Sequence, residues 1–128
     1  MIADTDFLIS LIQRDPDAVR KTKELESENV PIRIPAMAVL EFYIGVGAEL
    51  IDDEGRYVRR IIEAHPVVEM DREVAMRAGR RLGERGSGEF RRHKGDAAIG
   101  ATAEIADEPV LTRNVDDFES LGFVVEEY

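Results

Sequence analysis

The chain contains no cysteine among its 128 residues, and histidine is almost as scarce, with only His65 and His93. Without cysteine the protein can form neither a disulfide nor a thiolate metal site, so a reducing compartment suits it. The same scarcity leaves no Ser-His-Asp or Cys-His arrangement for nucleophilic catalysis. We expect both histidines to be surface or structural residues. His93 precedes Asp96 by three residues, so a substrate contact stays open for it.

Long apolar runs are also missing, and no stretch approaches the length that spans a membrane. The N-terminus reads Met1-Ile2-Ala3 and then Asp4, without the charged lead and apolar core of a signal peptide. We therefore expect a cytoplasmic protein. The length fits a single domain over residues 1–128, and no repeat or low-complexity segment divides it.

Positive charge is in short supply, since 17 lysines and arginines stand against 27 aspartates and glutamates, for a net charge of -10. This balance argues against a protein that holds nucleic acid through its overall charge. The exception is an arginine strip with a local charge of +5, which is either a solvated helix face with its loop or a phosphate-binding surface. The basic residues of this strip are Arg77, Arg80, Arg81, Arg85, Arg91, Arg92 and Lys94.

Short apolar runs alternate along the chain with longer helical patterns. The apolar runs predict strands at residues 1–3, 32–34, 67–70, 110–112 and 123–125. The helical patterns cover residues 15–27, 35–45, 49–64, 71–83 and 96–106, with a short helix after Asn114. Strands separated by helices imply parallel crossovers. The predicted fold class is therefore α/β, a three-layer α/β/α sandwich with a central parallel sheet of four or five strands.

Acidic and amide side chains directly follow two of the predicted strands. Asp4 follows the first strand, with Asp6 two residues later, and Asn114, Asp116 and Asp117 follow the fourth. In open parallel sheets, binding sites form beyond the carboxyl ends of the strands. Helix capping is the plain alternative, because Asp and Asn are favoured N-caps and the Asn114–Asp117 spacing resembles a capping box.

Two further acids lie in apolar surroundings. Glu41 belongs to a helix that is apolar on nearly every face, which indicates a buried helix in which a charged carboxylate is costly unless it is paired or bound to a cation. The alternative is a position at the exposed edge of that helix. Asp96 opens the small-residue helix Asp-Ala-Ala-Ile-Gly-Ala-Thr-Ala, which would pack closely on the sheet and bring Asp96 toward Asp4. Packing alone could also require these small residues.

Carboxylates gathered in this way suit a hard divalent cation. Mg²⁺ and Mn²⁺ take oxygen ligands, and clustered carboxylates repel one another unless a cation neutralises them. A metal ion in such a cluster lowers the pKa of an attacking water and offsets charge on a phosphodiester. The acids therefore predict metal-assisted hydrolysis of phosphate esters.

Four segments in order resemble PIN-domain proteins, and the VapC-type toxins of toxin-antitoxin pairs in particular. They are Asp4-Thr5-Asp6, Glu41 in its apolar helix, the helix that starts at Asp96, and residues 111–118, Leu-Thr-Arg-Asn-Val-Asp-Asp-Phe. The resemblance covers essentially the whole chain. It implies a PIN fold and a Mg²⁺- or Mn²⁺-dependent endoribonuclease that cleaves RNA. It also implies a homodimer that a small cognate antitoxin neutralises.

The resemblance assigns roles to individual acids. Asp4, Glu41 and Asp96 match the three principal acids of the family, and Asp4 and Asp96 would be the most direct metal ligands. The fourth acid maps to Asp117, just before Phe118, so these four residues are the expected catalytic set.

Other positions would support this set. Asn114 and Asp116 are the less favoured claimants for the place of the fourth acid, and Thr112 matches a hydroxyl that supports the cluster. Asp6 departs from the pattern, because many relatives have Asn there. A strongly acidic balance is unusual for a toxin of RNA, and the arginine strip would compensate locally by contacting the RNA backbone. The expected RNA contacts are Arg85, Arg91, Arg92 and Lys94.

Two other functions share features with this sequence. A phosphatase of the haloacid dehalogenase type shares the Asp4-Thr5-Asp6 opening and the Gly95-Asp96 pair, but it needs another acid soon after, where this chain has Ile99, Gly100 and Ala101. A non-catalytic metal-binding or partner-binding module, such as a receiver-like domain or a degenerate PIN fold, is the second. A receiver needs a lysine beyond a late strand, and a degenerate PIN domain should have lost some of its acids, whereas here all four are present.

Overall fold

The computed structural model describes the backbone of residues 1–49, 52–86 and 90–128, and the side chains of 1–45, 55–86 and 92–128. In these parts of the chain the strands are β1 (Ile2–Ala3), β2 (Ile34–Pro35), β3 (Val67–Val68), β4 (Val110–Thr112) and β5 (Val125–Glu127). The helices are α1 (Thr5–Ile12), α2 (Pro16–Ser27), α3 (Ala36–Glu49), α4 (Asp52–Ala64), α5 (Arg72–Glu84), α6 (Phe90–Ile105) and α7 (Val115–Ser120). This alternation of strands and helices confirms the predicted α/β class.

All strand pairs recorded among the described residues are parallel, as predicted. The largest sheet has three strands in the order β1-β4-β5, however, and β2 pairs with β3 in a separate sheet. A single bridge between Ile2 and Arg33 links the two sheets. The prediction of one sheet of four or five strands is wrong in this respect. The bridge is made by Arg33, which exchanges backbone hydrogen bonds with Met1 and Ala3 and precedes β2 by one residue, so this pairing stops before β2 begins.

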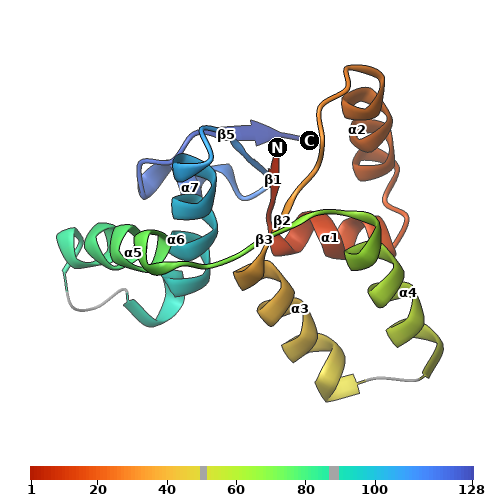
Figure 1. Cartoon of the computed structure of the whole chain (residues 1–128), viewed down its shortest axis with the longest axis horizontal. Helices are drawn as coiled ribbons and strands as arrows, with labels where there is room; N and C mark the ends of the chain where they lie inside the picture. The colour runs from red at the N-terminus through yellow and green to blue at the C-terminus, as the bar shows by residue number, and fades with distance from the viewer. Residues whose placement is uncertain (50–51, 87–89) are drawn as a thin grey trace.

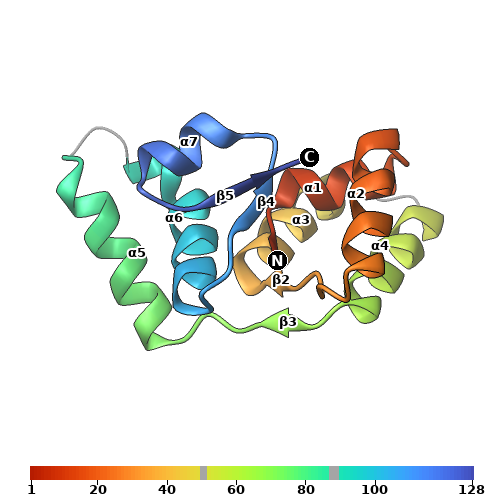
Figure 2. The ribbon, with the colours of Figure 1, turned by 90° about the horizontal axis from the view of Figure 1, so that it is seen from above.

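The helices cover the strands from both sides (Figures 1 and 2). Helices α5 and α6 lie on one side, while α1, α2 and α4 lie on the other. The predicted layered arrangement is confirmed. No helix in the described parts of the chain is both long and apolar enough to cross a membrane.

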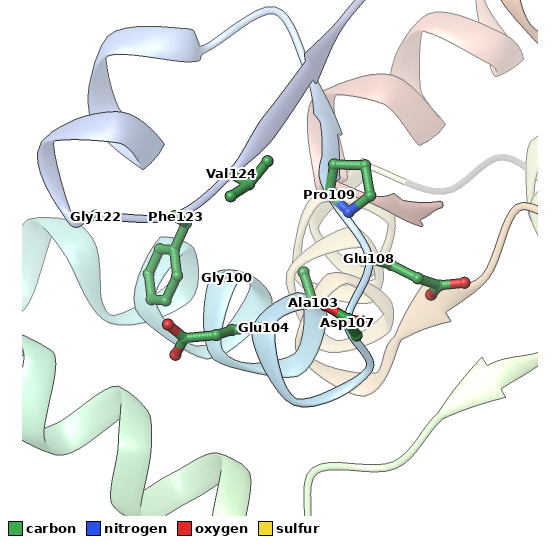
Figure 3. A pocket seen from close by; sticks show the side chains of 9 residues that line it. All are labelled: Gly100, Ala103, Glu104, Asp107, Glu108, Pro109, Gly122, Phe123 and Val124. Carbon is green, nitrogen blue, oxygen red and sulfur yellow. The ribbon is translucent and has the colours of Figure 1, made fainter.

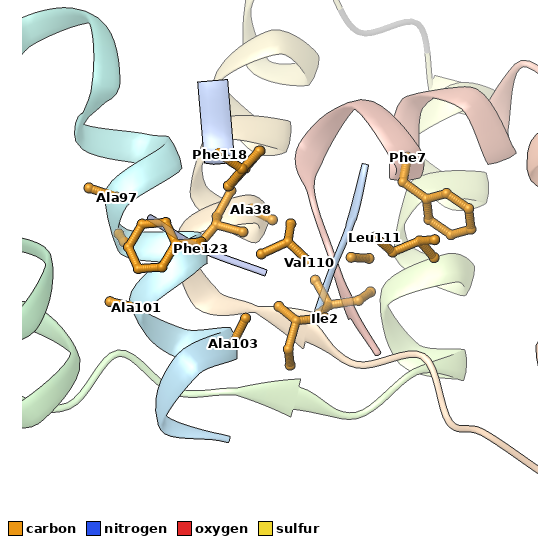
Figure 4. Close-up of a cluster of buried hydrophobic side chains, with 14 of the residues drawn as sticks. Ile2, Phe7, Ala38, Ala97, Ala101, Ala103, Val110, Leu111, Phe118 and Phe123 are labelled. Atoms are coloured by element: carbon orange, nitrogen blue, oxygen red, sulfur yellow. The ribbon is translucent and has the colours of Figure 1, made fainter. Parts of the chain in front are cut away.

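The core forms where α6 lies against the strands (Figure 4). Ile2, Val110 and Leu111 of the strands are fully buried, and so are Ala97 and Ala101 of α6. The small residues of α6 therefore do permit the close approach that the sequence predicted.

Helix capping explains several boundaries. Asp4, Asp15 and Asp71 each accept a hydrogen bond from a backbone N–H in the first turn of the next helix, as is typical of N-cap residues. The prediction that a helix starts at Asp96 is wrong, because α6 already begins at Phe90. Asp96 therefore lies inside a helix and caps nothing.

The expectation that the helix around Glu41 is buried also needs correction. Leu40, Tyr43 and Ile44 of α3 are exposed, with Ile44 retaining 65% of its accessible surface, while Ala38 and Phe42 are buried. An apolar sequence on all faces did not mean burial on all faces, because the neighbouring elements cover only part of this helix. Glu41 itself is half-buried.

Candidate active site

Asp4 is the most deeply buried acid of the site, at 3% exposure. It follows β1, and β1 pairs in parallel with β4, so the carboxyl ends of both strands meet at one edge of the sheet. The Phe7 N–H donates to Asp4 Oδ1 at 2.7 Å, and the Thr112 hydroxyl at the end of β4 donates to Asp4 Oδ2. The Thr112 hydroxyl in turn accepts from the Asn114 N–H at 2.8 Å. Asp4 is thus both an N-cap and a rigidly held carboxylate.

Glu41 reaches the same place from α3. The Thr5 hydroxyl donates to Glu41 Oε1 at 2.9 Å, which ties the carboxylate to the first turn of α1. Gly95 of α6 faces this carboxylate so closely that a Cβ at position 95 would lie 2.5 Å from Glu41 Oε2. The carboxylate therefore lies directly between α1 and α6.

Asp96 belongs to a second cluster of side chains that could hold a metal ion. His93 Nδ1 lies 3.4 Å from Asp96 Oδ2, one turn earlier on α6. One ligand atom from each of His93, Asp96 and Asp117 lies within 4.8 Å of the others, a spacing that a single metal ion can bridge. The Asn114 side chain donates to Asp117 Oδ2 at 2.8 Å and does not cap its own helix. The predicted capping box is therefore replaced by a contact that orients Asp117.

A cavity of about 130 Å³ joins these elements. Its lining combines the residue after β1, the first turn of α1, the middle of α3 and of α6, and the N-cap position of α7. The lining residues are Asp4, Thr5, Asp6, Glu41, Asp96, Ile99 and Asn114. Four of the seven carry a carboxylate, so the cavity is strongly negative.

Burial and mutual repulsion raise the pKa of three of these acids. The pKa of Asp4 rises from 3.8 to about 6, chiefly because burial removes water from the carboxylate, while the Thr112 and Phe7 hydrogen bonds act in the opposite direction. Burial also raises the pKa of Glu41 and Asp96, and Asp6 adds to the rise in each. Clustered acids that hold their protons in this way are typical of a site that a cation would neutralise.

The chemistry of the donors fits a hard divalent cation. Carboxylate oxygens from Asp4, Asp96 and Asp117 surround or adjoin the cavity, and imidazole from His93 is compatible with Mn²⁺ as well. We find no buried side-chain N or O atom without a hydrogen-bond partner in the described residues. The buried acid oxygens therefore have hydrogen-bond partners, and a cation would add the positive charge that balances the cluster.

The predicted site residues are thus largely brought together. Asp6 lines the cavity as an exposed residue, Asn114 lines it as well, and Asp117 adjoins Asp96. Asp116 is exposed and belongs to neither group. Sequence reasoning missed Thr5 and Gly95, and nothing in the local pattern points to either. His93 could have been placed beside Asp96 by its helical spacing of three residues, had the helix been predicted to begin earlier.

The arginine strip has a partly structural role. Arg77 and Arg81 form ion pairs with Glu104, and Arg81 also stacks on the Phe123 ring, at 5.1 Å from its centroid. Arg85 donates to the Ser120 carbonyl. These contacts tie α5 to α6 and to the segment after α7, so this half of the strip is not simply a solvated face.

Two other basic residues of the strip lie on the same helix as Asp96. Arg92 and Lys94 are exposed on α6, and within the described part of the chain neither makes an ion pair. The side chain of Arg91 lies outside the described residues.

A larger cavity, of about 190 Å³, lies between the second half of α6 and the segment before β5 (Figure 3). Phe123, Val124 and Pro109 line it, with Glu104 and Glu108 at its edges. Of the predicted site acids, none lines it. Size alone therefore does not identify the site, and the smaller acidic cavity is the chemically equipped one.

The family model described as PIN domain matches residues 1–124. The fold resembles DNA-bound VapBC from Salmonella typhimurium, at 21% identity and a TM-score of 0.80, over 98% of this chain and 96% of that one. It also resembles VapBC2 from Rickettsia felis bound to a promoter DNA fragment, at 16% identity and a TM-score of 0.78, over 99% and 97% of the two chains.

A toxin-antitoxin complex from Klebsiella pneumoniae is similar as well, at 22% identity and a TM-score of 0.73, over 98% of this chain and 95% of that one. At such identities the structural similarity shows a shared fold and nothing more. No match was found among curated proteins. The family model, by contrast, covers nearly the whole chain, and the protein belongs to the PIN-domain family.

Proposed function

We propose that this PIN-domain protein is a metal-dependent endoribonuclease and the toxin of a type II toxin-antitoxin pair. The observation that carries the proposal is the convergence of Asp4, Glu41 and Asp96 on one small acidic cavity at the carboxyl ends of β1 and β4. Membership of the PIN-domain family supports a nuclease. It also removes the haloacid dehalogenase alternative, which rested on two short motifs.

In this proposal Asp4 and Asp96 hold Mg²⁺ or Mn²⁺, with Glu41 and Asp117 completing the acidic set. A bound divalent cation supplies Lewis acidity, which lowers the pKa of an attacking water and offsets charge on the phosphodiester. The protein keeps the ligands in place through neighbouring groups. Thr112 holds Asp4 and Asn114 holds Asp117, so each carboxylate is oriented before a cation arrives.

The RNA backbone needs positive charge close to this negative cavity. Arg92 and Lys94 lie four and two residues before Asp96 on α6 and are exposed. We propose that they contact phosphates on either side of the scissile bond, together with Arg85 and Arg91. Such local contacts would hold RNA on a protein whose net charge of -10 repels it as a whole.

The proposed protein partners are a small cognate antitoxin and a second copy of the chain. The similar structures named above include toxin-antitoxin complexes. Ile9 on α1 and Leu40, Tyr43 and Ile44 on α3 are exposed apolar side chains, and Ile9 shares a small apolar hollow with Glu41. We assign this surface to the antitoxin, because a partner bound there would lie against an acid of the site.

The nuclease is tested with purified protein and a structured RNA, in Mg²⁺, Mn²⁺ or chelator, with DNA of the same sequence as a comparison. Asp4→Asn and Asp96→Asn should each reduce metal-stimulated RNA cleavage by at least about 100-fold, since loss of a ligand exceeds the usual effect of its supporting groups. Asp116→Asn, which removes an exposed acid near the site, is the matched control and should keep full activity. Far-UV circular dichroism checks the fold of each variant. Metal-stimulated cleavage that persists in both site variants would refute the proposal.

The antitoxin is tested separately. Any small protein encoded by a reading frame next to that of this chain would be co-expressed with it as the candidate antitoxin. A stoichiometric complex that suppresses cleavage supports this partner, and full cleavage in its presence contradicts it.

A further inference from the structure

Gly95 is a glycine in the interior of a helix, six residues into α6, where alanine is ordinarily the more stable choice. No turn or left-handed backbone explains it, since Gly86 and Gly122 are the glycines recorded with a positive φ among the described residues. The explanation lies on the neighbouring helix. A Cβ at position 95 would lie 2.5 Å from Glu41 Oε2, 2.8 Å from Cδ and 2.9 Å from Oε1.

All three atoms belong to one carboxylate, and that carboxylate is held on its other side. The Thr5 hydroxyl on α1 donates to Glu41 Oε1 at 2.9 Å. Glu41 is thus placed between a hydroxyl group and the bare backbone of α6. Since carbon atoms and their neighbours reach favourable contact at about 3.5 Å, a methyl group at position 95 would push the carboxylate back by about 1 Å.

We infer that Gly95 is a positioning residue, whose missing side chain sets the location of the Glu41 carboxylate within the acidic cavity. The inference deepens the proposed metal-dependent activity and rests on it. Gly95 directly precedes Asp96, a proposed metal ligand, on α6. Because position 95 has no side chain, the Glu41 carboxylate of α3 can lie in the same cavity as Asp96. A residue with a Cβ at position 95 would leave every acid present but move one of them.

A displacement of this size has a measurable effect on the site. Changes in the groups that orient metal ligands reduce metal affinity by roughly 10- to 100-fold. A shift of about 1 Å in a reacting group has effects of similar size on rate. Gly95→Ala should therefore weaken the site, although it deletes no polar group and introduces a residue that favours helix.

The test is Mn²⁺ binding by isothermal titration calorimetry on the folded chain, with Gly79→Ala as the matched control. Gly79 also lies inside a helix, α5, and a Cβ there would meet nothing within 4 Å. We expect Gly95→Ala to raise the Mn²⁺ dissociation constant about 10-fold or more. Gly79→Ala should leave it unchanged. Equal affinity of wild type and Gly95→Ala would overturn the inference.

A second measurement without metal separates this inference from the proposed function. In chelator, Gly79→Ala should raise the thermal unfolding midpoint, while Gly95→Ala should gain less or fall below wild type because of the clash with Glu41. In a Glu41→Ala background the clash is absent, so Gly95→Ala should raise the thermal unfolding midpoint as Gly79→Ala does. Equal effects of Gly95→Ala in both backgrounds would refute the positioning role. Absence of Mn²⁺ binding to the wild type would instead refute the proposed metal site.

Discussion

Asp4→Asn should make the metal-free protein more stable at neutral pH, although the same change should weaken the proposed metal site. The native carboxyl has its pKa raised to about 6, against 3.8 in the unfolded chain, mainly because it is buried. The folded state therefore binds this proton more tightly than the unfolded state. The stabilising effect of the proton is complete below pH 3.8 and is lost as the pH rises through about 6. Above that pH, the buried charge destabilises the metal-free fold.

The magnitude follows from the two pKa values. At about 1.4 kcal/mol per pH unit, a rise from 3.8 to about 6 corresponds to about 3 kcal/mol at neutral pH. Asparagine removes the charge and still accepts the Phe7 N–H as an N-cap. It loses the hydrogen bond from the Thr112 hydroxyl, which costs about 1 kcal/mol. The expected net gain for Asp4→Asn is therefore about 1–2 kcal/mol at pH 7.5 and none at pH 4.

The measurement is urea denaturation in chelator at several pH values between 4 and 8, with Asp116→Asn as the control for removal of an exposed acid. Saturating Mg²⁺ should reverse the order, because cation at 100 times its dissociation constant stabilises the wild type by about 2.7 kcal/mol and the variant by much less. The reasoning is refuted if Asp4→Asn lowers the free energy of unfolding at pH 7.5 in chelator. An unchanged pH dependence between pH 4 and 6 would refute it equally.

Two further predictions concern the residues around the site. Thr112→Val keeps the shape of the buried side chain but removes the hydroxyl that donates to Asp4 and accepts from the Asn114 N–H. It should lower the free energy of unfolding by about 1–3 kcal/mol, measured by urea denaturation, because it leaves buried polar groups unpaired; a loss below 0.5 kcal/mol, roughly the lower limit for one hydrogen bond, would contradict the role of Thr112. Gly100→Ala would place a Cβ 2.1 Å from the Phe123 ring and should cost about 1–3 kcal/mol, seen as a lower thermal midpoint. A thermal midpoint equal to that of Gly79→Ala would contradict this prediction, because it would show that Phe123 moves at no cost to make room for the methyl group.

Local features of the chain could be predicted where a short stretch of sequence is enough to determine structure. The caps at Asp15 and Asp71 depend on neighbouring residues only. Each involves groups a few residues apart, whose hydrogen bonds need no contact with a distant segment. The exact extent of the strands was harder to predict. The fifth strand was predicted at residues 123–125, two residues before its position at Val125–Glu127, where its register is set by pairing with the distant strand β4.

Contacts between distant segments could not be read in the same way. The meeting of Glu41 with Thr5 and Gly95, the ion pairs of Arg77 and Arg81 with Glu104, and the exposed face of α3 depend on how helices pack. The composition of these segments is compatible with several packings.

The amino-acid sequence alone thus determined the α/β class and the PIN resemblance and named the candidate acids, because residue type and short-range order carry that information. Only the tertiary structure decided that Asp96 lies inside its helix, that Asn114 orients Asp117, and that Gly95 makes room for Glu41. Distances of a few ångströms between side chains from different elements depend on the packing of the whole core, and no local pattern contains them.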